Sequence, residues 1–109
     1  MKKKHKLRVY LSGQMTGCED FNFPEFNKAA KVLREAGFEV LNPAEHTPHT
    51  HKDWAWYLIR DLQAMRKFKP DRIALLYGKD HSWKNSVGAK IEAEFAKKLG
   101  AEVYEFQSL

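Results

Sequence analysis

Residues Leu7–Gly17, with the sequence Leu-Arg-Val-Tyr-Leu-Ser-Gly-Gln-Met-Thr-Gly, decide the fold that this chain is expected to adopt. The run Leu7–Ser12 has the aliphatic and aromatic residues of a short buried strand, and Gly13 ends it. Glycines directly after a strand allow a ligand to approach the backbone closely. The loop matches neither the dinucleotide fingerprint nor the P-loop, so alone it is a weak functional signal.

Further along the chain, short β-like runs alternate with helical patterns, which is typical of a parallel sheet flanked by helices. Right-handed crossovers then place the first strand centrally, and this predicts an α/β fold with a four-stranded parallel sheet in the order 2-1-3-4. Ligands of such sheets bind beyond the carboxyl ends of the strands, where residues 12–17, Gly78 and the start of the third helix converge. The remaining strands are expected at 38–41, 72–77 and 101–106, and the helices at 24–36, 54–68 and 86–99.

The length and charge of the chain limit its organisation. With 109 residues, of which 43% are hydrophobic, the chain has material for one domain with one core, and disorder is excluded. Five of its 19 basic residues lie in residues 1–8 with no acid, so the 14 acids balance the bases of the rest. We therefore expect a basic tail at 1–6 and a domain at 7–109. A neutral domain makes nucleic acid an improbable partner, although a basic tail can bind phosphate.

Several classes of protein conflict with the composition. No stretch approaches the ~18 apolar residues of a membrane span, and no apolar run of a signal peptide follows the basic start. The single cysteine, Cys18, excludes an internal disulfide and a zinc finger. We expect a cytoplasmic protein, in a bacterial cytosol or that of a phage-infected host, without a metal or other cofactor.

Two acidic residues fall on the predicted buried faces of helices. Glu92 lies inside the apolar arc of the third helix, and Asp61 lies in the apolar stripe of the second. They are either structural partners of Arg60, Arg66 or a backbone amide, or converging groups that supply a nucleophile and a proton donor. We favour the second interpretation because both helices flank the third strand. The arc comprises Val87, Gly88, Ile91, Phe95, Ala96 and Leu99, and the stripe comprises Trp54, Leu58, Leu62, Met65 and Phe68.

Other polar and aromatic residues have open interpretations. Ser86 and Gly88 begin the third helix, where free N–H groups can bind an anion or a sugar hydroxyl, but Ser86 is equally suited to a simple N-cap. A cluster at His46, His49 and His51 has no regular metal-ligand spacing, and a metal site there is improbable. Trp54 is expected in the core and Trp56 at its rim, while Trp83 is either a lid over a base or a contact to a partner.

The ordered set of these motifs resembles the nucleoside 2-deoxyribosyltransferase-like superfamily over about residues 7–106. It looks most like the small phage-associated branch of unknown function within it (DUF4406-like), which opens with Y-x-S-G-P-M-T-G; here Gln14 replaces the Pro. The motifs are Val9–Gly17, Phe26-Asn27, Gly37–Ala44, Arg60-Asp61-Leu62, Ser86–Ala89 and Glu92.

The resemblance implies a flavodoxin-like three-layer sandwich and an activity on the N-glycosidic bond of a deoxynucleoside or its monophosphate. It implies that Glu92 is the nucleophile, that Asp61 lies near the base, and that Tyr10 orients the nucleophile. It also implies that Ser86 and Gly88 lie beside the sugar and its 5′ group. The remaining residues expected at the substrate are those of the first loop and the third strand end: Ser12, Gly13, Gln14, Met15, Thr16, Gly17 and Gly78.

Two functions remain in view. The first is cleavage or transfer of the glycosidic bond through a glutamate nucleophile, and the alternative is a catalytically silent protein that binds or sequesters a nucleotide. In either case the partner is a small nucleoside or nucleotide. A homodimer or higher homo-oligomer is expected, because three helices cannot cover both faces of a four-stranded sheet evenly and Trp56, Tyr57 and Trp83 exceed the needs of the core.

Overall fold

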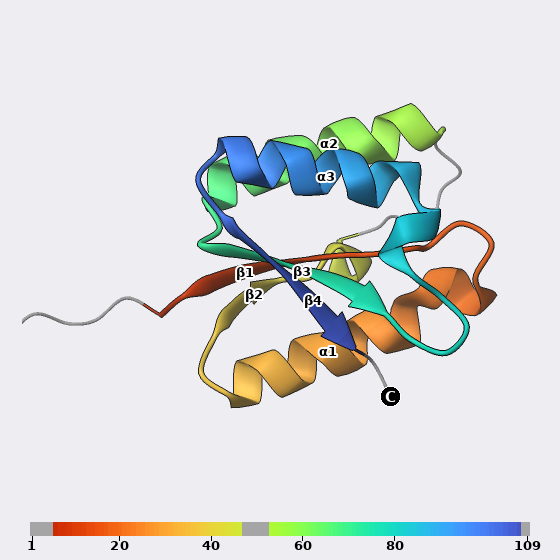
Figure 1. The fold of residues 1–109 in the computed structure, drawn as a ribbon, viewed down its shortest axis with the longest axis horizontal. Helices are drawn as coiled ribbons and strands as arrows, with labels where there is room; N and C mark the ends of the chain where they lie inside the picture. The colour runs from red at the N-terminus through yellow and green to blue at the C-terminus, as the bar shows by residue number, and fades with distance from the viewer. Residues whose placement is uncertain (1–5, 47–52, 108–109) are drawn as a thin grey trace, which may run out of the picture.

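The computed structural model describes residues 6–46 and 53–107, which form three α-helices around one sheet (Figure 1). Strands and helices alternate along the chain as the sequence predicts. Each α-helix begins and ends within one residue of the expected position. The elements are β1 (Arg8–Ser12), α1 (Phe23–Glu35), β2 (Glu39–Leu41), α2 (Trp54–Phe68), β3 (Arg72–Tyr77), α3 (Val87–Lys98) and β4 (Glu102–Gln107).

The sheet has four parallel strands in the order β2-β1-β3-β4, as the sequence predicts. Tyr10 pairs with Leu41 on one side and with Ile73 on the other, so β1 lies in the interior of the sheet. All carboxyl ends face the same edge, which also carries the loops that follow β1 and β3 (Figure 1). The strand order switches between β1 and β3, and ligands of such sheets generally bind beyond the carboxyl ends of the strands at this point.

The helices form two unequal layers, with α2 and α3 side by side on one face of the sheet and α1 on the other (Figure 1). Because successive side chains of β1 point to opposite faces of the sheet, they contribute to two separate parts of the core. Val9 and Leu11 pack with Phe26 on the α1 side, whereas Tyr10 packs with Met65 on the α2 and α3 side. The sheet thus separates an apolar cluster on the α1 side from a cluster on the α2 and α3 side that contains the phenol of Tyr10.

Three short 3-10 helices interrupt the segments that the sequence predicts as loops. They are η1 (Glu19–Asn22), η2 (Pro43–Glu45) and η3 (Trp83–Asn85). Asn42 begins η2 by accepting a hydrogen bond from the Ala44 N–H at 3.1 Å. Residues 47–52, which follow this turn, lie outside the described residues.

The buried face of α3 differs from the predicted arc. Val87, Ile91 and Leu99 are 64%, 37% and 41% exposed. The buried face is formed by Ala96, as predicted, and by Ala89 and Ala93, which lie outside the predicted arc. Small side chains bring the helix backbone close to the sheet, a preference that a count of large apolar residues overlooks. Glu92 lies on this buried face as predicted.

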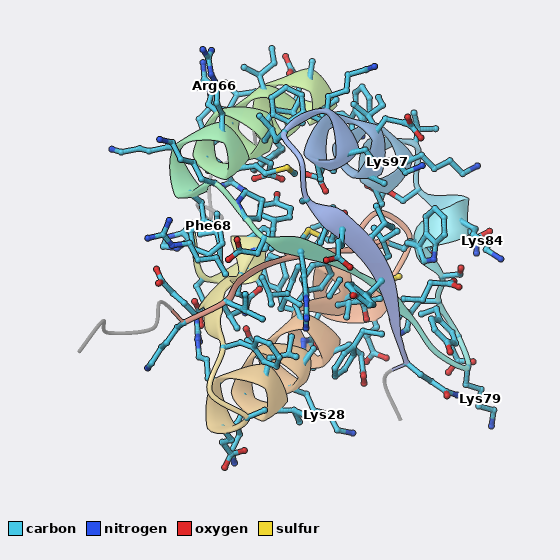
Figure 2. All side chains as sticks on the ribbon, turned by 60° about the vertical axis from the view of Figure 1, so that its left-hand side comes forward. Lys28, Arg66, Phe68, Lys79, Lys84 and Lys97 are labelled. Atoms are coloured by element: carbon cyan, nitrogen blue, oxygen red, sulfur yellow. The ribbon has the colours of Figure 1, made fainter. Side chains whose placement is uncertain are left out.

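The prediction that Trp54 belongs to the core is wrong. Its side chain is 51% exposed at the start of α2, where the helix extends beyond the sheet edge. Charged side chains occupy the outer surfaces in the usual way: Lys28, Lys84 and Lys97 point away from the body of the protein (Figure 2). Among the described residues, no helix is both long and apolar enough to cross a membrane.

Gly13 provides a test of this packing. A Cβ at Gly13 would lie 3.0 Å from Leu76 Cβ and 3.4 Å from Phe26 Cζ, both in the core on the α1 side. We expect Gly13→Ala to lower the free energy of unfolding by about 1–3 kcal/mol, measured by chemical denaturation. Gly88→Ala is the control, because its Cβ meets atoms no nearer than 3.7 Å and should leave stability unchanged or raise it slightly. Equal stability of the two variants would contradict the packing argument.

Candidate functional site

Glu92 lies at the centre of the candidate site. It projects from the second turn of α3 toward β1 and is only 7% exposed. Tyr10 donates its hydroxyl to Glu92 Oε2 at 3.1 Å, and Ser12 donates to Oε1 at 2.5 Å. Tyr10 and Ser12 are two residues apart on the strand and share a face, so each carboxyl oxygen has its own donor. The structure thus brings Tyr10 and Glu92 together, while the orienting role that the resemblance implies stays a prediction.

Asp61 lies beside Glu92, within hydrogen-bonding reach of it, and comes from α2. Its Oδ1 accepts two hydrogen bonds from Arg60, from Nε at 3.0 Å and from Nη2 at 2.7 Å. Asp61 is therefore both paired with Arg60 and close to Glu92, so the two arrangements considered from the sequence occur together. Two helices and one strand bring the two carboxyl groups into one buried cluster.

Burial raises the pKa of Glu92 to about 8, and the negative charge of Asp61 adds to this effect. The hydrogen bonds from Ser12 and Tyr10 act in the opposite direction but are outweighed. Burial also raises the pKa of Asp61, while Arg60 opposes the rise. The site therefore favours the protonated form of Glu92 at neutral pH, while the contact with Arg60 favours the charged form of Asp61.

The loop after β1 is held in place by Gln14. Its side-chain Oε1 accepts a hydrogen bond from the Ser82 N–H at 3.2 Å, and its backbone carbonyl accepts one from Asn22 Nδ2 at 2.9 Å. The loop is thereby joined to the segment that follows β3. Thr16 and Gly17 are exposed, and Gly17 has a φ of +84°, which favours glycine. Met15 packs against the core on the α1 side, so its side chain points away from Glu92.

The start of α3 also lies at the carboxyl edge of the sheet (Figure 1). Ser86 is an N-cap, since its Oγ accepts from the Ala89 N–H at 3.1 Å, and the first helical N–H groups have no partner within the helix. The indole of Trp54 lies beside this turn, where a Cβ on Gly88 would be 3.7 Å from its Nε1. Trp54 is therefore a candidate contact for a substrate ring. Helical periodicity assigned it to the core because it shares the stripe of Met65.

Trp83 connects the loop after β3 to the edge strand. Its indole Nε1 donates to Glu105 Oε2 at 2.9 Å, and its ring packs against the cluster that contains Tyr10. Gly78 is half-buried at the carboxyl end of β3, where its N–H donates to the His81 carbonyl at 2.8 Å. These contacts give the loop a defined position at the edge where Glu92 lies.

No metal-binding group of three His, Cys, Asp or Glu side chains is found in residues 6–46 and 53–107. His49 and His51 fall outside the described residues, so the histidine cluster is not tested. His46 is exposed and interacts through its carbonyl, which accepts from Arg60 Nη1 at 2.9 Å.

A separate hollow of about 640 Å³ lies at the opposite, amino-terminal edge of the sheet. Arg66, Lys69 and Leu99 are among its lining residues, and α2 and α3 end there. Basic residues at helix C-termini stabilise the helix dipoles, so their presence needs no ligand. The lining residues of the hollow include no buried carboxylate pair.

The arrangement suits chemistry at a carbon bearing a leaving group. A buried carboxyl group can attack or stabilise an electron-poor centre, and a second acid beside it can manage the proton of the leaving group. The fold and site thus define an α/β protein with a flavodoxin-like sheet and a carboxyl pair at its switch point.

Within that class, the chain belongs to the family described as a domain of unknown function (DUF4406), which it matches over residues 7–105. No curated protein matches the chain. Its fold is similar to that of a 2-deoxyribosyltransferase from the psychrotolerant bacterium Bacillus psychrosaccharolyticus, with a TM-score of 0.66 and 22% identity over 92% of this chain and 72% of that one. A 2-deoxyribosyltransferase from Leishmania mexicana gives a TM-score of 0.66 and 15% identity over 93% of this chain and 64% of that one.

The raised pKa of Glu92 predicts how stability depends on pH. A carboxyl group whose pKa rises on folding from 4.5 to about 8 stabilises the fold below pH 4.5 and loses this contribution as the pH rises to 8. Glu92→Gln keeps the neutral form throughout. We expect the variant to gain stability relative to the natural protein between these pH values, as measured by chemical denaturation at each pH.

The matched control for this prediction is Glu94→Gln on the exposed face of the same helix, where Glu94 pairs with Lys97 at 3.2 Å. Its stability should run parallel to that of the natural protein across the pH range. A constant difference between Glu92→Gln and the natural protein would show that Glu92 is not protonated on folding.

Proposed function

We propose that this protein cleaves the N-glycosidic bond of a deoxynucleoside or nucleoside monophosphate and passes the sugar to water or to another base. The observation that carries the proposal is the buried Glu92, which receives one hydrogen bond on each carboxyl oxygen and lies next to Asp61. The cation of this cluster, Arg60, contacts Asp61, whereas Glu92 is held by two hydroxyl groups. Glu92 is thus positioned to react.

In the proposed reaction, Glu92 attacks the anomeric carbon through a transition state with oxocarbenium character. The C1′–N bond breaks, its electron pair goes to the base, and a C1′–O bond forms to the carboxylate. The departing nitrogen takes a proton from the carboxyl pair, in which Glu92 favours the protonated form at neutral pH. Water or a second base then displaces Glu92.

The neighbouring surfaces fit the rest of a nucleoside. Trp54 offers an aromatic face beside Gly88, which suits contact with a base or sugar ring. The N–H groups at the start of α3 suit a 5′ hydroxyl or phosphate. Gln14 and Ser82 hold together the two loops that would close over the sugar.

The proposed nucleophile is tested by incubating the protein with a panel of deoxynucleosides and their monophosphates and measuring free base by chromatography. We expect Glu92→Gln to lower the cleavage rate by on the order of 10³-fold or more, because no other group of the site replaces a lost nucleophile. Glu94→Gln should cleave at the natural rate.

The outcomes separate the two functions. Unchanged cleavage by a folded Glu92→Gln protein would refute the mechanism. Ligand binding without any release of base in the natural protein would favour the alternative, a catalytically silent nucleotide-binding protein.

We also propose that two copies associate through the outer face of α2 and α3. Val87 and Ile91 lie one turn apart on α3, and Trp54 of α2 lies beside Gly88 of the same helix. These three residues and Ile59 on α2 are each more than one third exposed. Aromatic residues such as Trp54 are enriched at the centre of interfaces, and two-fold dimers are the commonest assemblies. Such a contact would place the second copy next to the carboxyl edge of the sheet.

Light scattering tests the association at micromolar concentration. We expect a mass of about twice the 12.7 kDa of one chain, and a decrease toward one chain in Val87→Asp. Val32→Asp is the control, because Val32 is 48% exposed on α1 at the other face of the sheet. A mass near 12.7 kDa for the natural protein would contradict the association.

A further inference from the structure

Arg60 makes an unusual contact with its neighbour in the sequence. Its Nε and Nη2 both donate to Asp61 Oδ1, at 3.0 and 2.7 Å. Two donors on one oxygen leave Oδ2 of the same carboxylate outside this contact. The side chains of Arg60 and Asp61 are 22% and 16% exposed, so bulk water screens the pair weakly.

The guanidinium is fixed by further contacts. Its Nη1 donates to the carbonyl of His46, at the end of η2, at 2.9 Å. The rings of Trp56 and Tyr57 lie 5.8 and 5.5 Å from its central carbon. A cation held by a carboxylate, a carbonyl and two aromatic rings has little freedom to move away from Asp61.

We propose that Arg60 is a positioning residue that keeps Asp61 as the carboxylate and thereby leaves the proton of the Asp61–Glu92 pair on Glu92 in the free protein. The proton assignment concerns the folded protein itself, whereas its catalytic meaning rests on the proposed function. No distance between Arg60 and substrate is implied, because Arg60 acts through Asp61.

The groups around the pair support this assignment. β1 contributes Tyr10 and Ser12, α2 contributes Arg60 and Asp61, and α3 contributes Glu92. Among these groups of the described chain, Arg60 is the cation, and it contacts one carboxyl group of the pair. Two neighbouring carboxyl groups in a buried site do not both ionise readily, so a cation on one side decides which of them does. Burial also raises the pKa of Tyr10 well above its ordinary value, so Tyr10 stays a donor.

The stored proton has a use in the proposed reaction. When a base binds near Asp61 Oδ2, the proton of Glu92 can pass through that oxygen to the base nitrogen. Glu92 becomes the carboxylate that attacks C1′, and the base nitrogen receives both the proton and the electron pair of the broken bond. One proton transfer therefore activates the nucleophile and neutralises the leaving group.

Carbon-13 NMR of side-chain carboxyl groups in the folded natural protein tests the assignment without any substrate. Glu92→Gln and Asp61→Asn identify the two signals. At pH 6 to 7 we expect Glu92 to be protonated and Asp61 to be ionised. The reverse pattern, or two ionised groups, would overturn the proposal whether or not the protein cleaves nucleosides.

Variants of Arg60 test the cause. Arg60→Gln should raise the proton affinity of the Asp61 carboxylate on the order of tenfold, seen as a titration displaced to higher pH, and Arg60→Lys should restore part of the natural behaviour because it keeps the charge. Arg34→Gln is the matched control: Arg34 also pairs with a carboxylate of η2, Glu45, at 2.7 and 2.8 Å, but lies on α1. It should leave both titrations unchanged.

A purely structural Arg60 would give a different result. Arg60→Gln would then lower stability while Asp61 and Glu92 titrated as in the natural protein, and this outcome would overturn the proposal. If Arg60→Gln does not fold, the comparison of Arg60→Lys with Arg34→Gln decides, since loss of the bidentate geometry alone should displace the Asp61 titration measurably. Absence of cleavage would refute the proposed function but would not alter these titrations.

Discussion

The hydrogen bonds from Tyr10 and Ser12 to Glu92 join the central strand to α3, and much of the surrounding structure depends on them. A carboxyl group can reach β1 only if the helix backbone comes close to the sheet. This closeness explains why the face of α3 turned to the sheet carries Ala89, Ala93 and Ala96 beside Glu92. It also explains the exposure of the larger Val87 and Ile91, which have no space beneath the helix. The position of one functional group thus determines how a whole helix packs.

Burying Glu92 next to Asp61 costs free energy if both carboxyl groups are charged, and a proton on one of them lowers this cost. An isolated buried carboxylate is strongly unfavourable, and two side by side are more so. Arg60 stabilises the charge of Asp61, while Glu92 takes the neutral form with hydrogen bonds to both of its oxygens. In the proposed reaction, the proton held by this arrangement would pass to the leaving base.

The element order, the parallel sheet and the buried position of Glu92 could be predicted from the sequence, because turn residues such as Gly37 and Gly100 and the helical periodicity carry that information. The orientation of α3 could not be predicted. Hydrophobicity scales favour the burial of Val87 and Ile91, whereas the buried residues include alanines, whose small side chains let the helix approach the sheet. Trp54 was misplaced for a related reason: periodicity defines a stripe along α2 but not the point at which the helix extends past the sheet. Arg60 was foreseen only as one of several partners of Asp61, since the contact of both donors with a single oxygen depends on side-chain geometry.

The division of the core by the sheet explains how a chain this short can accommodate a buried charged site. On the α1 side, Val9, Leu11 and Phe26 form a cluster with no ionisable member. On the other side, Tyr10, Glu92 and Asp61 replace apolar contacts with a polar network. Because residues of β1 alternate between these sides, one strand contributes to both stability and chemistry. Substitutions facing α1 should therefore alter stability with little effect on the carboxyl pair, whereas substitutions facing α2 and α3 change both at once.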